Sequence, residues 1–109
     1  MKSYYYKTGI EGKNTIKATV DYYKDAGGYC VLFEVGDMEN GVFSWHIDAD
    51  YFNFYQRPSA RLLTPAGRRS EAKKREAEAY MEAHALDLLQ EFARSAEELG
   101  APHMEIEAA

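Results

Sequence analysis

The spacing of the apolar residues changes once along this chain, and that change limits the folds open to it. In residues 15–23 apolar side chains occupy every second position, and the alternation resumes over 29–35 and 42–47. A period of two is typical of strands that bury one face. Beyond Met81 the apolar residues recur at steps of three and four up to Leu99, which is typical of an amphipathic helix. The chain is therefore predicted to form strands first and a helix second.

Glycine-containing segments separate the predicted strands. Residues 9–12 and 25–28 are expected to form turns between them. Asn40-Gly41 suits a tight hairpin because both residues tolerate positive φ angles. The loop that this pair closes is expected to begin near Gly36. These signals predict an antiparallel meander of three to four strands.

The strand region is predicted to extend over residues 3–56, and the Tyr-rich segment 3–8 is its first strand. Its last part, 51–56, is compatible with an edge strand or with a short helical turn. Pro58 ends that part in either case, because proline lacks the backbone N–H that either structure would use.

One long helix is predicted in the second half, with two starts left open. Thr64-Pro65 is one, because threonine can cap a helix and proline fits its first position; Ser70-Glu71 is the other. No helix-breaking residue follows until Gly100. A helix over about 65–99 on one sheet face makes a two-layer α+β sandwich.

The domain organisation follows from these elements. The chain has 109 residues, which is enough for one continuous core without disulfides or metals. We expect a single domain over 1–100 and a flexible tail over 101–109. No internal repeat divides the domain.

The predicted helix is longer than the sheet that it covers. At about 1.5 Å per residue, a helix of about 35 residues measures roughly 52 Å. A strand of about eight residues measures only ~27 Å. The helix is therefore expected to extend past the sheet at its start, where the apolar stripe is missing, or to pack against another chain. A homodimer through the long helix, with this start beside the acidic half of the partner helix, is one such arrangement.

Positive charge is concentrated around this predicted helix start. The whole chain has a net charge of −5, but residues 57–75 carry seven cations and one acid, Glu71. A helix start is itself electropositive, so cations placed there oppose the helix dipole. Such an arrangement suggests a use in binding. The cations are Arg57, Arg61, Arg68, Arg69, Lys73, Lys74 and Arg75.

No pattern of residues indicates an enzyme, a metal site or a bound cofactor. The three histidines, His46, His84 and His103, have no metal-ligand spacing. The serines lack a G-x-S-x-G context, and the glycines match no nucleotide-binding fingerprint. Cys30 is the single cysteine, so we expect a reducing, cytoplasmic setting. No apolar run approaches the ~20 residues needed to span a bilayer, so no membrane association is expected.

Two binding hypotheses remain, and a protein partner is the favoured one. Tyrosine and arginine are enriched at the energetic centres of protein interfaces, and the nine tyrosines exceed the places in one sheet-to-helix core. The alternative is nucleic acid, bound through phosphate contacts along 57–75. The acidity of the whole chain weakens the attraction of a polyanion. The residues predicted to contact a partner are Tyr22, Tyr23, Tyr51, Tyr55 and the seven cations named above.

Two resemblances bear on the kind of partner. A compact, acidic, motif-free chain that begins with a Tyr-rich segment resembles small proteins of phages and mobile elements, such as the anti-CRISPR inhibitors. That resemblance implies an inhibitor or modulator of a host nucleic-acid-processing complex. Residues 25–33 are similar to the opening hairpin of HicB-type antitoxins, which implies an antitoxin-like regulator. Glu34-Val35-Gly36 stands here where that family has a proline-containing stretch, and no functional residues are transferred from either family.

Overall fold

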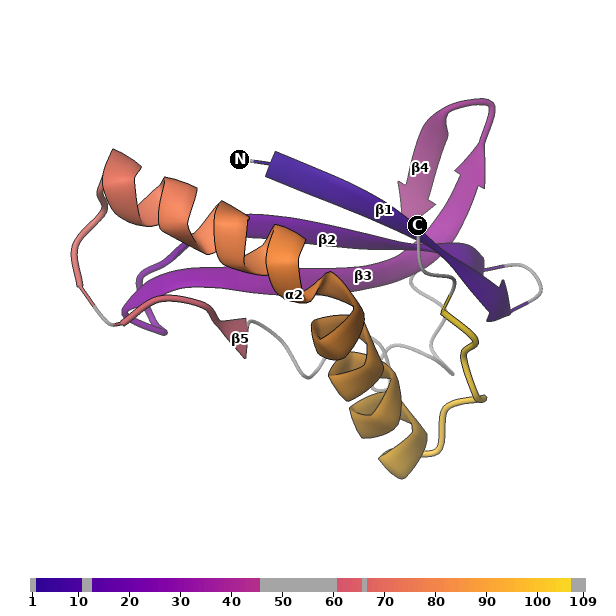
Figure 1. The fold of residues 1–109 in the computed structure, drawn as a ribbon. Helices are drawn as coiled ribbons and strands as arrows, with labels where there is room; N and C mark the ends of the chain where they lie inside the picture. The colour runs from indigo at the N-terminus through magenta and orange to yellow at the C-terminus, as the bar shows by residue number, and fades with distance from the viewer. Residues whose placement is uncertain (1, 11–12, 46–60, 66, 107–109) are drawn as a thin grey trace.

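In the residues that the structure describes, a five-stranded antiparallel sheet lies beside one long helix (Figure 1). The computed structural model describes residues 2–10, 13–45, 61–65 and 67–106. The elements in chain order are β1 (Lys2–Ile10), β2 (Lys13–Tyr23), β3 (Gly28–Glu39), β4 (Val42–Trp45), β5 (Arg61–Leu62) and α2 (Glu71–Glu98).

The strands form a meander in the order β1-β2-β3-β4, which confirms the predicted α+β class. β5 is an addition to the predicted sheet. It pairs with the first half of β3, through Cys30 opposite Leu62, while β4 pairs with the second half. β5 has only two residues and both are exposed. The sequence therefore shows no alternation of apolar and polar residues that would have predicted this strand. Residues 51–56, left open between strand and helix, lie outside the described residues.

The hairpin between β3 and β4 turns at the predicted pair. Asn40 and Gly41 have φ angles of 53° and 77°, the positive values that a two-residue hairpin loop requires. The prediction that this loop begins near Gly36 was wrong. β3 continues to Glu39 and pairs with β4, beginning with Gly36 opposite Trp45. This pairing gives hydrogen-bond partners to backbone N–H and C=O groups that a loop would leave without them.

The hydrophobic core lies between α2 and one face of the sheet. Alternate residues of β2 and β3 supply the sheet side, and in the register Ala18 lies opposite Phe33. The Phe33 ring meets the ring of Phe92 on α2 with a centroid separation of 4.9 Å. The fully buried residues with the largest side chains include Ile16, Val20, Val31, Met81 and Leu89.

The opposite face of the sheet carries a smaller aromatic cluster. In the register Phe43 lies opposite Met38 and Trp45 opposite Gly36, so Phe43 projects away from α2. Its ring centroid lies 6.0 Å from that of Tyr5, and the Lys17 ammonium lies 5.7 Å from its centroid. The sheet therefore has apolar residues on both faces, whereas its sequence pattern predicted one apolar face.

The helix begins later than the predicted residue 65. Ser70 is the N-cap, and its hydroxyl accepts a hydrogen bond from the Lys73 backbone N–H at 3.2 Å. The second of the two candidate starts is therefore the one used. The helix ends at Glu98, and Gly100, with φ of 104°, takes the left-handed conformation that commonly follows a helix.

A bend at His84 changes the course of the helix. His84 has φ of −121° and ψ of 20°, outside the helical range, and Figure 1 shows that the second half of α2 continues in a different direction from the first. Ala77 and Met81, before the bend, are fully buried. Leu88 and Leu89, after the bend, are almost completely buried. The predicted overhang was wrong, because the bend lets both arms, the parts of α2 before and after it, pack on the core and the apolar stripe extends into the first arm.

The chain after the helix packs against the core as far as residue 106. Ala101 and Met104 are buried, and Ile106 contacts the core cluster. The Cβ of Glu105 lies 3.6 Å from the place where a Cβ of Gly9 would project, so this segment lies beside the end of β1. A flexible tail was expected over 101–109, but residues 101–106 pack against the core instead.

Candidate functional site

Five cations cluster at the start of α2, and we call this group the cationic end. The start of the helix lies at the same end of the molecule as the turn between β2 and β3 (Figure 1). A backbone hydrogen bond of 2.7 Å from the Gly67 N–H to the Gly27 carbonyl joins the two. The cationic end consists of Arg68, Arg69, Lys73, Lys74 and Arg75.

Two tyrosines of the sheet hold this helix start in place. The Tyr29 hydroxyl accepts from the Ser70 N–H at 2.9 Å and donates to the Ser70 carbonyl at 3.0 Å. The Tyr22 hydroxyl donates to the Gly67 carbonyl at 3.0 Å. The two rings meet edge-on, with centroids 5.4 Å apart. The backbone that carries the cations is therefore fixed to the sheet immediately before the helix begins.

Replacing Tyr29 by Phe is expected to lower the free energy of unfolding by about 1–3 kcal/mol, because two hydrogen bonds are lost at about 1 kcal/mol each. Tyr29 is only 5% exposed, so water cannot freely replace the missing partner. Tyr22→Phe is the matched control, since it removes one such bond. Urea denaturation measures both, and amide exchange of Ser70 should quicken in Tyr29→Phe. Equal stability of Tyr29→Phe and the wild type would contradict this anchoring.

The cationic end has no acidic partner among the described residues. The ion pairs of the described residues join Lys2 to Glu78 and Glu82, Arg61 to Glu91, and His103 to Glu97. Within the described ranges, the Arg69 guanidinium lies over the Tyr22 ring, 5.2 Å from the ring centroid. This group of cations is therefore not neutralised within the part of the chain that the structure describes.

The backbone adds to the positive field at this place. The first N–H groups of a helix lack intrahelical acceptors, and the aligned peptide dipoles place a partial positive charge there. Glu71 is the acid in the first turn, and its side chain is exposed. Arg68, Arg69 and Arg75 are exposed as well. The arrangement favours contact with a negatively charged surface.

The predicted contact residues separate into several groups. Tyr22 is half-buried and packs against the core, so it supports the cationic end from below. Tyr23 is half-buried on the other face of β2, and its pKa is raised, chiefly by burial. Arg61 lies on β5 and pairs with Glu91 at 3.6 Å, apart from the helix start. Tyr51, Tyr55 and Arg57 lie outside the described residues.

Sequence reasoning missed Tyr29 and treated Ser70 only as a possible cap. A signal for Tyr29 was available in the strand register. With a turn at residues 25–28, Tyr22 and Tyr29 become cross-strand neighbours, and both lie on the face that α2 covers. Two hydroxyls on that face could reach the chain entering the helix.

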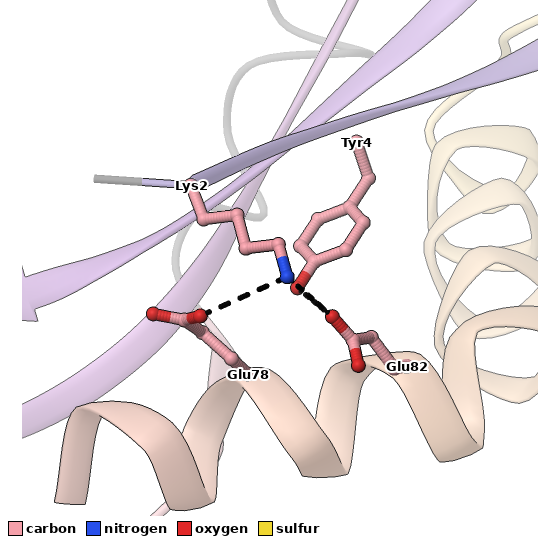
Figure 2. A network of polar contacts seen from close by, with 4 residues as sticks. All are labelled: Lys2, Tyr4, Glu78 and Glu82. Carbon is pink, nitrogen blue, oxygen red and sulfur yellow. Dashed lines mark hydrogen bonds and ion pairs between the residues drawn. The ribbon is translucent and has the colours of Figure 1, made fainter.

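A second polar network fastens β1 to α2. Figure 2 shows Lys2 and Tyr4 reaching from the strand to Glu78 and Glu82 on the helix. The Lys2 ammonium donates to Glu82 at 2.7 Å and lies 3.9 Å from Glu78. The Tyr4 hydroxyl donates to the same Glu82 oxygen at 2.8 Å. The network was not predicted, because residues this far apart in sequence have no common pattern.

This network predicts a loss of stability in alkali. Burial, and then the hydrogen bond to Glu82, raise the pKa of Tyr4 from 10.0 to about 12. The hydrogen bond to Glu82 also raises the pKa of Lys2 above 10.5. Because the folded state holds both protons more strongly, their contribution is complete below pH 10.0 and is lost as the pH rises toward about 12.

Ultraviolet titration of the tyrosines tests this expectation. The phenol ionisation near pH 12 should disappear in Tyr4→Phe and remain in Tyr5→Phe, which removes an exposed tyrosine from the same strand. Loss of the same late step in Tyr5→Phe would contradict the assignment. At the acid end, hydrogen bonds from Lys2 and Tyr4 lower the pKa of Glu82 below 4.5, so its contribution is lost only as the pH falls below that value.

The described residues contain no group of three or more His, Cys, Asp or Glu that could hold a metal ion. Burial raises the pKa of the Cys30 thiol, which disfavours the reactive thiolate. No helix in the described ranges is both long enough and apolar enough to cross a bilayer. Comparison with protein-family models, curated proteins and solved structures finds no match to this chain.

Proposed function

We propose that this chain is a non-enzymatic binding protein whose cationic end docks onto an acidic surface of a protein partner. One observation carries the proposal: five cations are held at a fixed helix start, with no acid in ion-pair contact among the described residues. Cations at this position oppose the helix dipole, so they contribute little to folding. An acidic partner would relieve that repulsion when it binds.

The extent of the charge favours a protein over a nucleic acid. At physiological ionic strength charges act over about 8 Å, so the cationic end attracts ligands only locally. The flanking sequence is acidic, with nine acids and one cation over residues 76–109. A long polyanion would continue onto that acidic surface, whereas a compact acidic patch need not. The ring of Tyr22, which could stack on a base, instead packs beneath Arg69.

The narrower expectation concerns the identity of the partner. Resemblance to small phage proteins implies a nucleic-acid-processing complex that this chain inhibits or modulates. The resemblance lies in size and composition, and this part of the proposal stays a prediction. Reconstitution with candidate complexes is the direct test of it.

A titration with two polyanions tests the docking proposal. Poly-L-glutamate and duplex DNA are titrated by fluorescence anisotropy at low and at physiological salt. The test variant is Arg68→Gln with Arg75→Gln, two exposed cations without a described contact. The control is Lys7→Gln with Lys17→Gln, which changes the net charge equally on the sheet.

The proposal predicts that poly-L-glutamate binds at low salt, that salt weakens the binding, and that the test variant weakens it far more than the control. Tighter binding of DNA than of poly-L-glutamate would instead identify a nucleic-acid-binding protein. Absence of binding to either polyanion at low salt would overturn the role of the cationic end. An equal loss in the test and control variants would show that net charge alone is responsible.

A further inference from the structure

The sheet face that points away from α2 contains a hollow with the size of a small-molecule site. Its volume is about 390 Å³, and ligand pockets range from roughly 300 to 1,000 Å³. Tyr5 and Lys7 of β1 and Met38 of β3 line it, together with Thr15 of β2, the strand between them. Thr15 lies opposite Lys7 in the register and is only 5% exposed, so it forms the floor. We call this the sheet hollow.

The apolar part of its lining can pack against an aromatic ring. Tyr5 is 48% exposed, and the Phe43 ring supports its ring in a tilted contact with 6.0 Å between the centroids. Tilted and offset contacts are the favourable geometries for aromatic rings. Met38 contributes a thioether chain, which adapts its shape and makes favourable contacts with ring edges. A flat ring placed against Tyr5 and Met38 would therefore bury apolar surface.

A polar group of the lining is held in a fixed orientation. The side-chain oxygen of Asn14, which also lines the sheet hollow, accepts from the Met38 N–H at 2.9 Å and from the Thr15 hydroxyl at 2.7 Å. The backbone N–H of Asn14 donates to Asp37 at 3.2 Å. The two bonds to the oxygen use both of its lone pairs. The amide NH2 group, which donates to none of the described residues in these bonds, is left to contact a ligand.

The charge of the sheet hollow favours an anion. The chain has 18 acidic and 13 basic side chains, yet none of the described lining residues is acidic and Lys7 is basic. Lys7 is exposed and makes no ion pair with a described residue. Its ammonium and the Asn14 NH2 group only donate hydrogen bonds, whereas a carboxylate only accepts them. A ligand with an ammonium group would find no carboxylate in this lining.

We propose that the sheet hollow binds a small aromatic carboxylate. Its ring packs on Tyr5 and Met38, and its carboxylate accepts hydrogen bonds from Lys7 and Asn14. A ring against the aromatic wall and an anion at the donors are both required, because a partly exposed ammonium alone binds an anion weakly.

This site is separate from the cationic end. Figure 1 shows the end of β1 and the beginning of β2 at the opposite end of the sheet from the start of α2. Thr15 and Tyr22 are roughly 23 Å apart along β2, at ~3.3 Å per residue. Poly-L-glutamate has no aromatic ring, so it is not a ligand of the sheet hollow. The proposal therefore does not depend on the proposed function.

Nuclear magnetic resonance of the 15N-labelled chain tests the site. The probes are 2-naphthoate and 2-naphthylmethylamine, which share a ring system and differ in the sign of their charge. We expect 2-naphthoate to cause saturable shifts of the Lys7, Thr15 and Met38 amides and of the Asn14 side-chain NH2, and the amine to bind at least fivefold more weakly. Absence of saturable shifts with 2-naphthoate, or equal binding of the amine, would overturn the proposal.

Two variants separate the contribution of the charge from that of the ring. Lys7→Gln should weaken 2-naphthoate about fivefold without weakening the amine. Tyr5→Leu should weaken both probes, by about three- to tenfold. The matched control is Lys24→Gln, an exposed position in the turn between β2 and β3 that changes the net charge as much as Lys7→Gln does. Circular dichroism confirms that each variant is folded.

The controls also decide where the carboxylate binds. Neither Lys24→Gln nor Arg68→Gln with Arg75→Gln should change the affinity for 2-naphthoate. An equal loss in Lys7→Gln and Lys24→Gln would show that net charge alone is responsible. A loss confined to the variant of the cationic end would place the carboxylate there. Either result would overturn the sheet hollow as the site.

Discussion

Replacing Phe92 by Ala is expected to lower the free energy of unfolding by about 3–5 kcal/mol, the cost typical of emptying a buried aromatic site. Phe92 is 4% exposed, and its ring lies 4.9 Å from the ring of Phe33 on β3. This pair joins the second arm of α2 to the sheet. The loss has two parts. The free energy gained by burying the ring is lost, and a cavity remains that the sheet cannot close.

Denaturation with urea measures this loss. Leu86→Ala is the matched control, because Leu86 lies on the same helix and is 42% exposed. It should cost about 1 kcal/mol or less, since exposed substitutions away from special features have small effects. Comparable losses in the two variants would show that the second arm does not rest on the sheet through Phe92.

Replacing Gly36 by Ala is expected to cost about 2–3 kcal/mol, at the upper part of the range for overpacking. A Cβ at this position would lie 2.8 Å from the Phe43 ring and closer still to the carbonyl oxygen of Ser44. The ring could rotate, but the carbonyl belongs to the paired strand β4. The strands would therefore have to separate locally, which should weaken the pairing of Met38 with Phe43 as well.

Gly9→Ala provides a control for the intrinsic effect of the substitution. A Cβ there would lie 3.6 Å from the Cβ of Glu105, an ordinary contact. We expect it to change the free energy of unfolding by well under half as much, and amide exchange in β4 to quicken only in Gly36→Ala. Stability of Gly36→Ala equal to that of Gly9→Ala would contradict the close approach of β4 to β3.

The strand half of the fold could be predicted from sequence because its determinants are local. Alternation over 15–23 and 29–35 fixed which residues face the core, and Asn40-Gly41 fixed one hairpin. The side chains of β4 were less predictable. Phe43 is apolar but faces away from α2, since the register of an unbroken β3 decides its direction. Hydrophobic patterning cannot distinguish two apolar faces of one sheet.

The bend in α2 illustrates a limit of another kind. Helix interiors bend sharply at proline or glycine in most cases, and residues 71–98 contain neither. The bend coincides instead with a contact between the His84 and Tyr80 rings, whose centroids are 4.3 Å apart. It depends on how both arms pack against the sheet. Because a straight helix was assumed, its length suggested that its start would extend past the sheet, which the folded chain does not show.

The sequence showed which cations lie close together along the chain, but not the contacts that hold this segment against the sheet. The charge pattern located the cations, and Ser70 was one of two caps considered. Tyr22 was predicted to contact a partner, and in the structure its hydroxyl and ring also make contacts within the chain. A tyrosine count cannot separate structural from exposed tyrosines. That distinction depends on the cross-strand register and on where the segment before the helix returns to the sheet.

The central claim is that the cationic end is free of internal ion pairs, and the stability of one multiple variant tests it most directly. In this variant Arg68, Lys73, Lys74 and Arg75 are all replaced by Gln, while Arg69 keeps its contact with Tyr22. Cations near a helix start are each unfavourable by about 0.3–1 kcal/mol. We therefore predict a free energy of unfolding equal to or above that of the wild type. A fall of more than about 2 kcal/mol would show that these side chains hold the fold together through buried or paired charges, and would contradict the account.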